Sequence, residues 1–202
     1  MSGPGLISIL DYGSGNIRSA LRALEHVGLN VEVTSSYERA LGADGLVVPG
    51  VGAFGNCINQ LKEIRGDEVI RERNKSGRPT LGICVGMQVL FEKSAESQEP
   101  GLALITGAVE KLSAPVLPHI GWNELHAEQA PKLLTGLLNE RFYFVHSYAV
   151  KKSSQGSAFA TSNYGENFLA VIEQGALSAV QFHPEKSGEA GLQLLRNWAD
   201  SI

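Results

Sequence analysis

The sequence has few of the features that mark secreted or membrane proteins. It contains two cysteines, Cys57 and Cys84, which are too few for a disulfide framework. It does not open on a charged segment followed by an apolar core, so no signal peptide is expected. No uninterrupted apolar run reaches the ~18 residues that a membrane-spanning helix needs. These absences predict a reducing, cytoplasmic setting.

The sequence also lacks the signals of nucleic-acid and cofactor binding. It has 17 Lys and Arg against 21 Asp and Glu, a net charge of −4, and its basic residues are scattered. There is no internal repeat, phosphate loop or metal-ligand cluster, and Gly13-x-Gly15 is too short for a dinucleotide fingerprint. No nucleic acid, metal or cofactor is therefore expected. The 202 residues fit one domain, 1–202, whose first five residues are expected to be flexible.

The first half of the chain alternates strand and helix patterns. An apolar run at 6–10 predicts a strand, and apolar positions at helical spacing from Ile17 to Val27 predict a helix that Gly28 ends. Strands at 31–34 and 45–48 continue an alternation that is typical of βαβ units. From residue 115 onward the strands become shorter, with candidates at 142–145, 159–161 and 169–172. We predict an α/β fold: a mostly parallel central sheet with helices on both faces and an antiparallel extension.

Cys84 stands between Gly82 and Gly86, where an apolar strand pattern gives way to a helical one. This is the arrangement of a nucleophile on a sharp strand-to-helix turn, which leaves room only for hydrogen beside the nucleophile. The first N–H groups of the following helix would favour a thiolate there. The alternative is a small buried cysteine in a glycine-rich turn. Cys57 lies on a helical apolar face and is expected in the core, as is Trp198.

A base and a carboxylate follow near the C-terminus. The strand pattern at 179–182 ends at His183, and Pro184 favours an extended backbone before it. Glu185 can then return to the far ring nitrogen of His183 and fix its tautomer. Alone, His183 would be read as a structural histidine; together with Cys84 and Glu185 it predicts a catalytic triad. His146 competes as the base, but no acid stands beside it.

Acyl transfer also needs donors aimed at the developing oxyanion. One is predicted to be the backbone N–H of Val85, the residue after the nucleophile. The other is predicted to be that of Val51, because Gly50 and Gly52 allow the backbone to approach the substrate closely. This loop and Cys84 both follow strands, so they are expected at one edge of the sheet. The alternative is an ordinary strand-to-helix turn, since an apolar helical face follows.

Several motifs in order resemble the class I, or triad, glutamine amidotransferases, namely Gly82-Ile83-Cys84-Val85-Gly86-Met87-Gln88 and His183-Pro184-Glu185. More narrowly, PGVGAF at 49–54, PHIGWN at 118–123, FYFVHSY at 142–148 and QFHPEKS at 181–187 resemble the glutaminase subunits of imidazole glycerol phosphate synthase. The resemblance runs from about Ile7 to the C-terminus. It implies that glutamine is hydrolysed to glutamate and ammonia through a cysteinyl thioester.

The resemblance also implies which residues hold the glutamine. Gln88 and Glu96 would bind its amino and carboxylate groups, although a loop glutamate such as Glu96 is more often only solvated. The segment His146-Ser147-Tyr148 would offer its backbone to the α-carboxylate.

A partner is implied in the same way. A cyclase subunit, a (βα)8 barrel, would receive the ammonia in a heterodimer and make imidazole glycerol phosphate and an aminoimidazole carboxamide ribonucleotide for histidine biosynthesis. The resemblance places Asn16, Tyr143 and Lys186 near the mouth of the ammonia passage. Trp122 follows Gly121 in what is expected to be a loop, outside any apolar periodicity, and is predicted to be an exposed interface anchor. The alternative for Trp122 is a small satellite core.

Two other functions remain as alternatives. A glutaminase subunit for pyridoxal phosphate or anthranilate synthesis would have a different oxyanion loop, with a third glycine in place of Val51 or a Gly-Gly-Glu-Ser pattern. A binding protein that has lost catalysis is disfavoured because all three triad positions are filled.

The Gly50-Val51 peptide is further expected to act as a switch. One orientation aims the Val51 N–H at the oxyanion and the other removes it, so the isolated subunit would be a poor glutaminase until its liganded partner activates it. The alternative is a permanently formed oxyanion hole.

Overall fold

The computed structural model describes residues 5–151, 158–200 and 202. The expectation of a flexible start therefore falls outside the described residues, apart from Gly5, which belongs to no helix or strand. A seven-stranded sheet forms the centre of the molecule, in the order β10-β11-β12-β4-β3-β1-β2. Its strands are β1 (Leu6–Leu10), β2 (Asn30–Thr34), β3 (Gly45–Gly50), β4 (Thr80–Cys84), β10 (Ala158–Tyr164), β11 (Glu166–Gln174) and β12 (Leu177–Val180).

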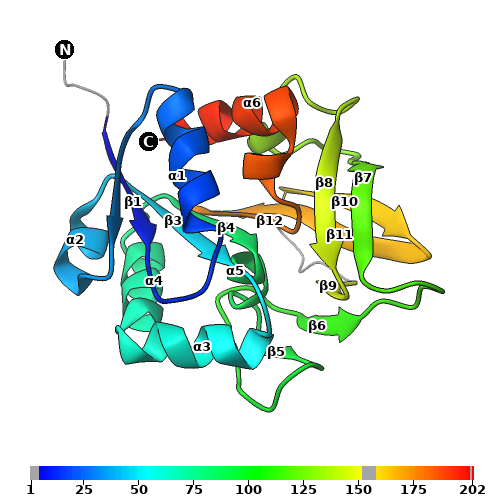
Figure 1. Cartoon of the computed structure of the whole chain (residues 1–202), viewed down its shortest axis with the longest axis horizontal. Helices are drawn as coiled ribbons and strands as arrows, with labels where there is room; N and C mark the ends of the chain where they lie inside the picture. Colours follow the sequence, from blue (N-terminus) through cyan, green and yellow to red (C-terminus); the bar gives the residue numbers. More distant parts are fainter. Residues whose placement is uncertain (1–4, 152–157, 201) are drawn as a thin grey trace.

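Five of these strands, from β12 to β2, run parallel, whereas β11 and β10 extend the sheet in antiparallel fashion. Helices α1 (Ile17–His26) and α6 (Gly188–Ala199) lie on one side of the sheet, and α3 (Phe54–Glu63) and α4 (Gly66–Lys75) lie on the other (Figure 1). The short helices are α2 (Tyr37–Gly42), α5 (Val85–Gln88), η1 (Lys132–Leu134) and η2 (Pro184–Lys186). This is the α/β fold that the sequence predicts.

Two small sheets flank the central one. β5 (Lys93–Ser94), β6 (Ala108–Lys111) and β9 (Tyr148–Val150) form one of them. β7 (His119–Glu124) and β8 (Arg141–His146) form the other, an antiparallel pair. The β7–β8 pair stands beside the end of β12, as Figure 1 shows.

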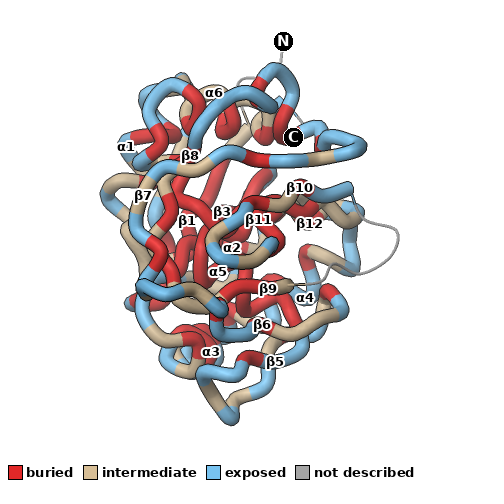
Figure 2. Tube along the Cα trace, turned by 90° about the vertical axis from the view of Figure 1, so that its right-hand side faces the viewer, coloured by how far each residue is buried: buried red, intermediate tan, exposed pale blue. Residues whose placement is uncertain are grey.

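The packing confirms the sequence patterns that predicted the elements. The central strands are buried between the helical layers (Figure 2). α1 buries Ala20, Ala23 and Leu24, and it ends just before Gly28, whose φ of +87° is a conformation that favours glycine. Cys57 and Trp198 lie in the core as expected, at 0% and 1% exposure. Within the described ranges, the helices are all too short or too polar to cross a membrane.

The carboxyl ends of the parallel strands meet at one edge of the sheet. Gly50, at the end of β3, is the direct ladder partner of Cys84, at the end of β4. β12 pairs with the other side of β4, so the chain after Val180 leaves the sheet at the same edge. Parallel sheets bind ligands at this edge, and it places the predicted site residues together.

Candidate active site

Cys84 occupies a sharp and strained corner between β4 and α5. Its backbone has φ 56° and ψ −112°, in a region that residues other than glycine seldom adopt. A Cβ on Gly82 would lie 2.6 Å from the Gly86 carbonyl oxygen, and a Cβ on Gly86 would collide with the Val48 carbonyl. The predicted steric need for both glycines is therefore confirmed. Cys84 is only 4% exposed.

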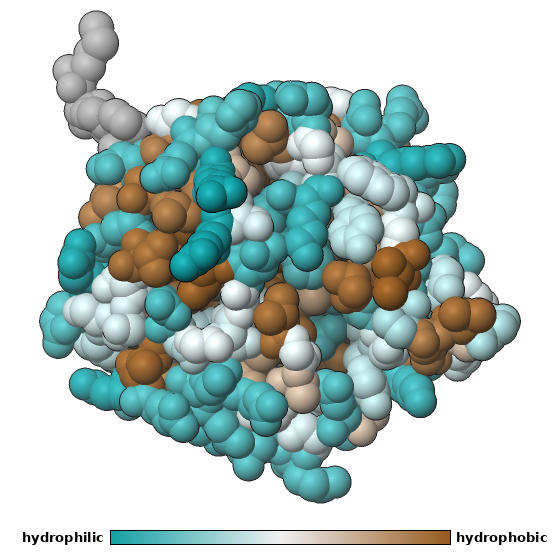
Figure 3. Space-filling view, viewed as in Figure 1, coloured by the Kyte–Doolittle hydropathy of each residue, from teal (hydrophilic) through white to brown (hydrophobic). Residues whose placement is uncertain are grey.

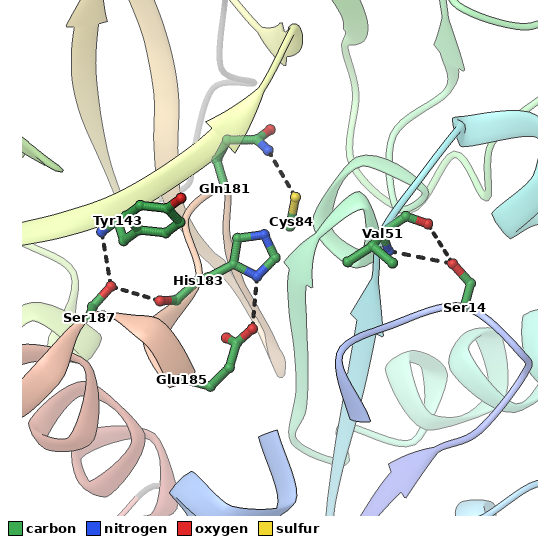
Figure 4. Close-up of polar contacts among 8 residues, drawn as sticks. All are labelled: Ser14, Val51, Cys84, Tyr143, Gln181, His183, Glu185 and Ser187. Carbon is green, nitrogen blue, oxygen red and sulfur yellow. Dashed lines mark hydrogen bonds and ion pairs between the residues drawn. The ribbon is translucent and has the colours of Figure 1, made fainter. Parts of the chain in front are cut away.

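His183 is held at the end of the segment that follows β12. Its backbone N–H donates to the Tyr143 carbonyl over 3.0 Å, and its carbonyl accepts from Ser187 Oγ over 2.7 Å. Its Nδ1 lies 2.8 Å from Glu185 Oε1, and both side chains are 2% exposed. Its Nε2 is buried without a hydrogen-bond partner among the described residues, on the side where Cys84 lies (Figure 4).

The surroundings of His183 favour its protonated form. Burial lowers the pKa of His183, but the Cys84 side chain and the Glu185 carboxylate outweigh burial and raise this pKa to about 10. An imidazolium at this position suits a neighbouring thiolate and can donate a proton to a leaving group. The pKa of His146, the other candidate base, shifts in the opposite direction, because burial lowers it to about 3. His146 is therefore neutral near pH 7, and the Tyr148 carbonyl, not an acid, receives its Nδ1–H over 3.0 Å.

A cavity of about 290 Å³ opens beside Cys84 and His183. Its lining includes the predicted residues Val51, Gly52, Cys84, Val85, Gln88, Glu96, His146, Ser147, Tyr148 and His183, with Pro118 and Val145 in addition. Glu185 and Gly50 stand outside this lining. A Cβ on Gly50 would collide with the Gly86 nitrogen, so Gly50 is needed for the close approach of two loops. In the described part of the chain, no three His, Cys, Asp or Glu side chains are placed to hold a metal ion.

Gln88 and Glu96 both use part of their polar groups to hold the cavity walls. Glu96 Oε2 accepts the N–H of Phe54, the first residue of α3, over 2.8 Å. Glu96 is exposed, but unlike a glutamate that contacts only solvent it forms a hydrogen bond to the backbone. Gln88 Nε2 donates to the Tyr148 carbonyl over 2.9 Å and to Gln181 Oε1 over 3.0 Å. The second oxygen of Glu96 and the oxygen of Gln88 take no part in these bonds.

The two N–H groups predicted as oxyanion donors differ in whether they already have an acceptor. Val85 opens α5, and the first N–H groups of a helix have no acceptor within it. The Val51 N–H instead donates to Ser14 Oγ over 3.4 Å, on the side of Val51 away from Cys84 (Figure 4). Ser14 Oγ in turn donates to the Val51 carbonyl over 2.6 Å, and Cys57 Sγ lies 3.4 Å from that carbonyl. The Val51 N–H is therefore occupied and not aimed at the nucleophile.

Sequence reasoning missed Ser14 and Gln181, although both had a signal. Gln181 precedes His183 by two positions in an extended segment, so strand periodicity places the two side chains on the same face. Ser14 follows β1, whose carboxyl end neighbours that of β3. Loops from neighbouring parallel strands meet at that edge.

Trp122 lies on strand β7, so the expectation that it stands in a loop is wrong. Its side chain is 53% exposed, as predicted for an interface residue, and the alternative of a small satellite core is wrong. It faces Tyr143 of β8, with the ring centroids 6.0 Å apart. Ile120 on the same face of β7 is 60% exposed, and hydrophobic side chains are exposed on this side of the molecule (Figure 3). Asn16, at the start of α1, is half-buried, and Lys186 is exposed.

A family profile and individual sequences of known proteins both match this chain over nearly its whole length. The profile of the class-I glutamine amidotransferase family matches residues 8–201. HisH subunits of imidazole glycerol phosphate synthase from Mycobacterium tuberculosis and Nocardia farcinica are similar to the chain, at 51% and 52% identity. Each alignment covers 97% of this chain and 98% of the relative.

Solved structures share the fold at much lower identity. A crystal structure described as a glutamine amidotransferase superposes with a TM-score of 0.77 at 21% identity, covering 96% of this chain and 98% of that one. The structure of PurLQS from Thermotoga maritima superposes with a TM-score of 0.75 at 18% identity, covering 98% and 99%. At these identities the likeness concerns the fold alone.

Proposed function

The chain belongs to the class-I glutamine amidotransferase family, and we propose that Cys84, His183 and Glu185 carry out its hydrolysis of glutamine. The observation that carries the proposal is the buried His183 ring, which is hydrogen-bonded to Glu185 through Nδ1 and presents an unpartnered Nε2 toward Cys84. A nucleophile, a base and an orienting acid are thus arranged as covalent acyl transfer requires.

The reaction runs in two halves. The Cys84 thiolate attacks the side-chain amide carbon of glutamine, and the His183 imidazolium protonates the departing ammonia, leaving a glutamyl thioester. His183, now neutral, removes a proton from water, and the resulting hydroxide releases glutamate. Glu185 keeps the imidazole in one tautomer and stabilises its charged form.

The chain functions as the glutaminase subunit of imidazole glycerol phosphate synthase, as its HisH relatives do. It therefore supplies ammonia to a cyclase and contributes to histidine biosynthesis. We propose that this cyclase is a (βα)8 barrel that forms a heterodimer with the chain. Exposed Trp122 and Ile120, close to the active-site edge, support a docking face on β7 and β8, with Asn16, Tyr143 and Lys186 around the ammonia exit. Two free cysteines are consistent with a cytoplasmic setting.

We also propose that the Gly50-Val51 peptide switches the enzyme on. The bond from the Val51 N–H to Ser14 is long, at 3.4 Å, whereas the bond from Ser14 to the Val51 carbonyl is short, at 2.6 Å. Rotation of the Gly50-Val51 peptide breaks the weaker of these two bonds, leaves the Val51 carbonyl on Ser14, and turns the N–H toward Cys84. One oxyanion donor is worth roughly 100- to 1000-fold in rate, which is enough for a switch.

The experiment compares two nitrogen sources in the complex of this chain with its cyclase. Product formation is measured with glutamine and then with ammonium, for the natural chain and for Cys84→Ala. We expect Cys84→Ala to abolish glutamine-dependent synthesis and to leave ammonium-dependent synthesis unchanged. Glutamine-dependent synthesis that persists in Cys84→Ala would contradict the proposal.

A further inference from the structure

Gln181 is a buried polar residue in contact with the nucleophile. It is 0% exposed, and its Nε2 donates to Cys84 Sγ across 3.7 Å (Figure 4). The catalytic steps above do not use it. Its backbone N–H is bonded separately to the Ala170 carbonyl over 2.9 Å, so the backbone of the segment is held independently of the amide.

The orientation of the Gln181 amide is set by Gln88. The Tyr148 carbonyl can only accept a hydrogen bond, so the group that faces it at 2.9 Å must be the NH₂ of Gln88. The other hydrogen of the same NH₂ then points to Gln181 at 3.0 Å, where it needs an acceptor, Oε1. Gln181 is consequently left with its NH₂ toward the Cys84 sulfur.

The same network continues away from the site through two histidines. His146 Nδ1 lies 3.0 Å from the Tyr148 carbonyl and must donate to it, so its Nε2 is an acceptor. His119 Nδ1, at 3.2 Å, donates to that Nε2. The His119 ring is stacked on Tyr164, with centroids 4.0 Å apart. Because these histidines are at most 7% exposed, the Tyr148 carbonyl that orients Gln88 is itself fixed.

We propose that Gln181 is a further catalytic residue, whose Nε2–H stabilises the Cys84 thiolate, and that Gln88 is a positioning residue that keeps this donor turned toward the sulfur. The proposal rests on Cys84 being the nucleophile. A donor held in place before the reaction favours the charged sulfur over the neutral thiol, since hydrogen bonds to charged groups are the stronger ones. If the Gln181 amide had only a structural role, its replacement would change the stability of the protein but not the protonation of the Cys84 sulfur.

The test measures the rate at which iodoacetamide alkylates Cys84 as a function of pH, in the intact chain without glutamine. Cys57 is 0% exposed, and Cys84→Ser supplies the blank that removes any contribution from it. The variants are Gln181→Met, which removes the donor and keeps the volume, and Gln88→Met, which releases the Gln181 amide. The matched control is Ser162→Ala, a fully buried hydroxyl on β10 that bonds to the Glu124 carbonyl, three strands away from β4.

We expect Gln181→Met to move the midpoint of the alkylation profile upward by about one pH unit, which makes alkylation at neutral pH about tenfold slower. Gln88→Met should move it in the same direction by less, and Ser162→Ala should leave it unchanged. The kcat for glutamine should fall in Gln181→Met with little change in KM. If Gln181→Met does not fold, Gln181→Asn, which is too short to reach both partners, takes its place.

An unchanged alkylation profile in a folded Gln181 variant would overturn the proposal, even if that variant lost activity. The proposed function would still stand in that case, because it is tested separately by Cys84→Ala. If Cys84→Ala and Gln181→Met both hydrolysed glutamine as fast as the natural chain, the proposed function and the proposed role of Gln181 would both be contradicted.

Discussion

The Val51 N–H donates to the Ser14 hydroxyl over 3.4 Å, and the same hydroxyl donates to the Val51 carbonyl over 2.6 Å. Ser14 therefore holds the Val51 N–H, which we propose as an oxyanion donor, in an orientation that faces away from Cys84. A weak hydrogen bond contributes on the order of 1 kcal/mol, or roughly fivefold in an equilibrium between two orientations.

Ser14→Ala removes this restraint. We expect the isolated chain to release glutamate roughly two- to tenfold faster, because the Val51 N–H is freed to face the oxyanion. The activity of the complex with its cyclase and nucleotide ligand should change less. Glutamate production by the isolated chain is the measurement, with Ser76→Ala, an exposed hydroxyl at the end of α4, as the control. An isolated Ser14→Ala chain no faster than the natural one would favour a permanently formed hole.

The triad predicts a graded loss of activity. His183→Ala should lower kcat by roughly 10²- to 10⁴-fold, because both proton transfers are lost. Glu185→Ala should be milder, at roughly 10- to 100-fold, because it removes one charge-assisted hydrogen bond while His183 remains. Steady-state glutamate release by the complex measures both. Equal activity of Glu185→Ala and the natural chain would remove Glu185 from the mechanism.

Trp122→Ala tests the docking face. Trp122 is 53% exposed, so its removal should leave the melting temperature nearly unchanged. We expect affinity for the cyclase to fall roughly 30-fold, the effect of an aromatic anchor at an interface. Titration calorimetry with the cyclase measures the affinity. Phe159→Ala, another exposed aromatic residue, on β10, is the control. A large loss of melting temperature with intact binding would contradict the assignment.

Acid stability tests the neutral state of His146. Burial lowers its folded pKa to about 3, below the ~6.5 expected in the unfolded chain. As the pH falls, the unfolded chain therefore binds the proton at a higher pH than the folded chain. The contribution of His146 to the free energy of unfolding is complete above pH ~6.5 and is lost as the pH falls toward 3. His146→Gln keeps a donor but cannot titrate. Denaturant unfolding between pH 7 and pH 4 should show a shallower loss for His146→Gln, by about 1 kcal/mol per pH unit. Parallel profiles would show that His146 has the same pKa in the folded and the unfolded chain.

The sequence predicted the elements whose apolar positions follow one period. It missed α4, where the buried stripe is Gly66, Val69, Ile70 and Arg73. The spacing is helical, but a charged residue interrupts the apolar pattern. Arg73 is fully buried because its guanidinium donates to backbone carbonyls, including that of Ala43 over 2.7 Å and that of Pro79 over 2.8 Å. Ala43 lies 30 residues away and Pro79 lies beyond the end of α4, so neither partner can be read from the periodicity of the helix.

Local patterns were sufficient to predict the three residues proposed as the triad, but not the residues that contact them. Cys84 is marked by flanking glycines, and Glu185 lies two positions from His183, so short motifs carry this information. The contact of Ser14 with Val51 and that of Gln181 with Cys84 join segments 37 and 97 residues apart. These contacts depend on strand order, which places β3 beside β1 and β12 beside β4.

The most direct test of Cys84 as the nucleophile is to locate the acyl group during turnover. The complex is mixed with isotope-labelled glutamine, quenched in acid within a turnover, digested and mapped by mass spectrometry. We expect a labelled glutamyl group on the peptide that contains Cys84, absent from Cys84→Ser and removed by hydroxylamine as a thioester is. A glutamyl group on the Cys57 peptide, or full glutamate release by Cys84→Ser, would contradict the assignment of Cys84 as the nucleophile.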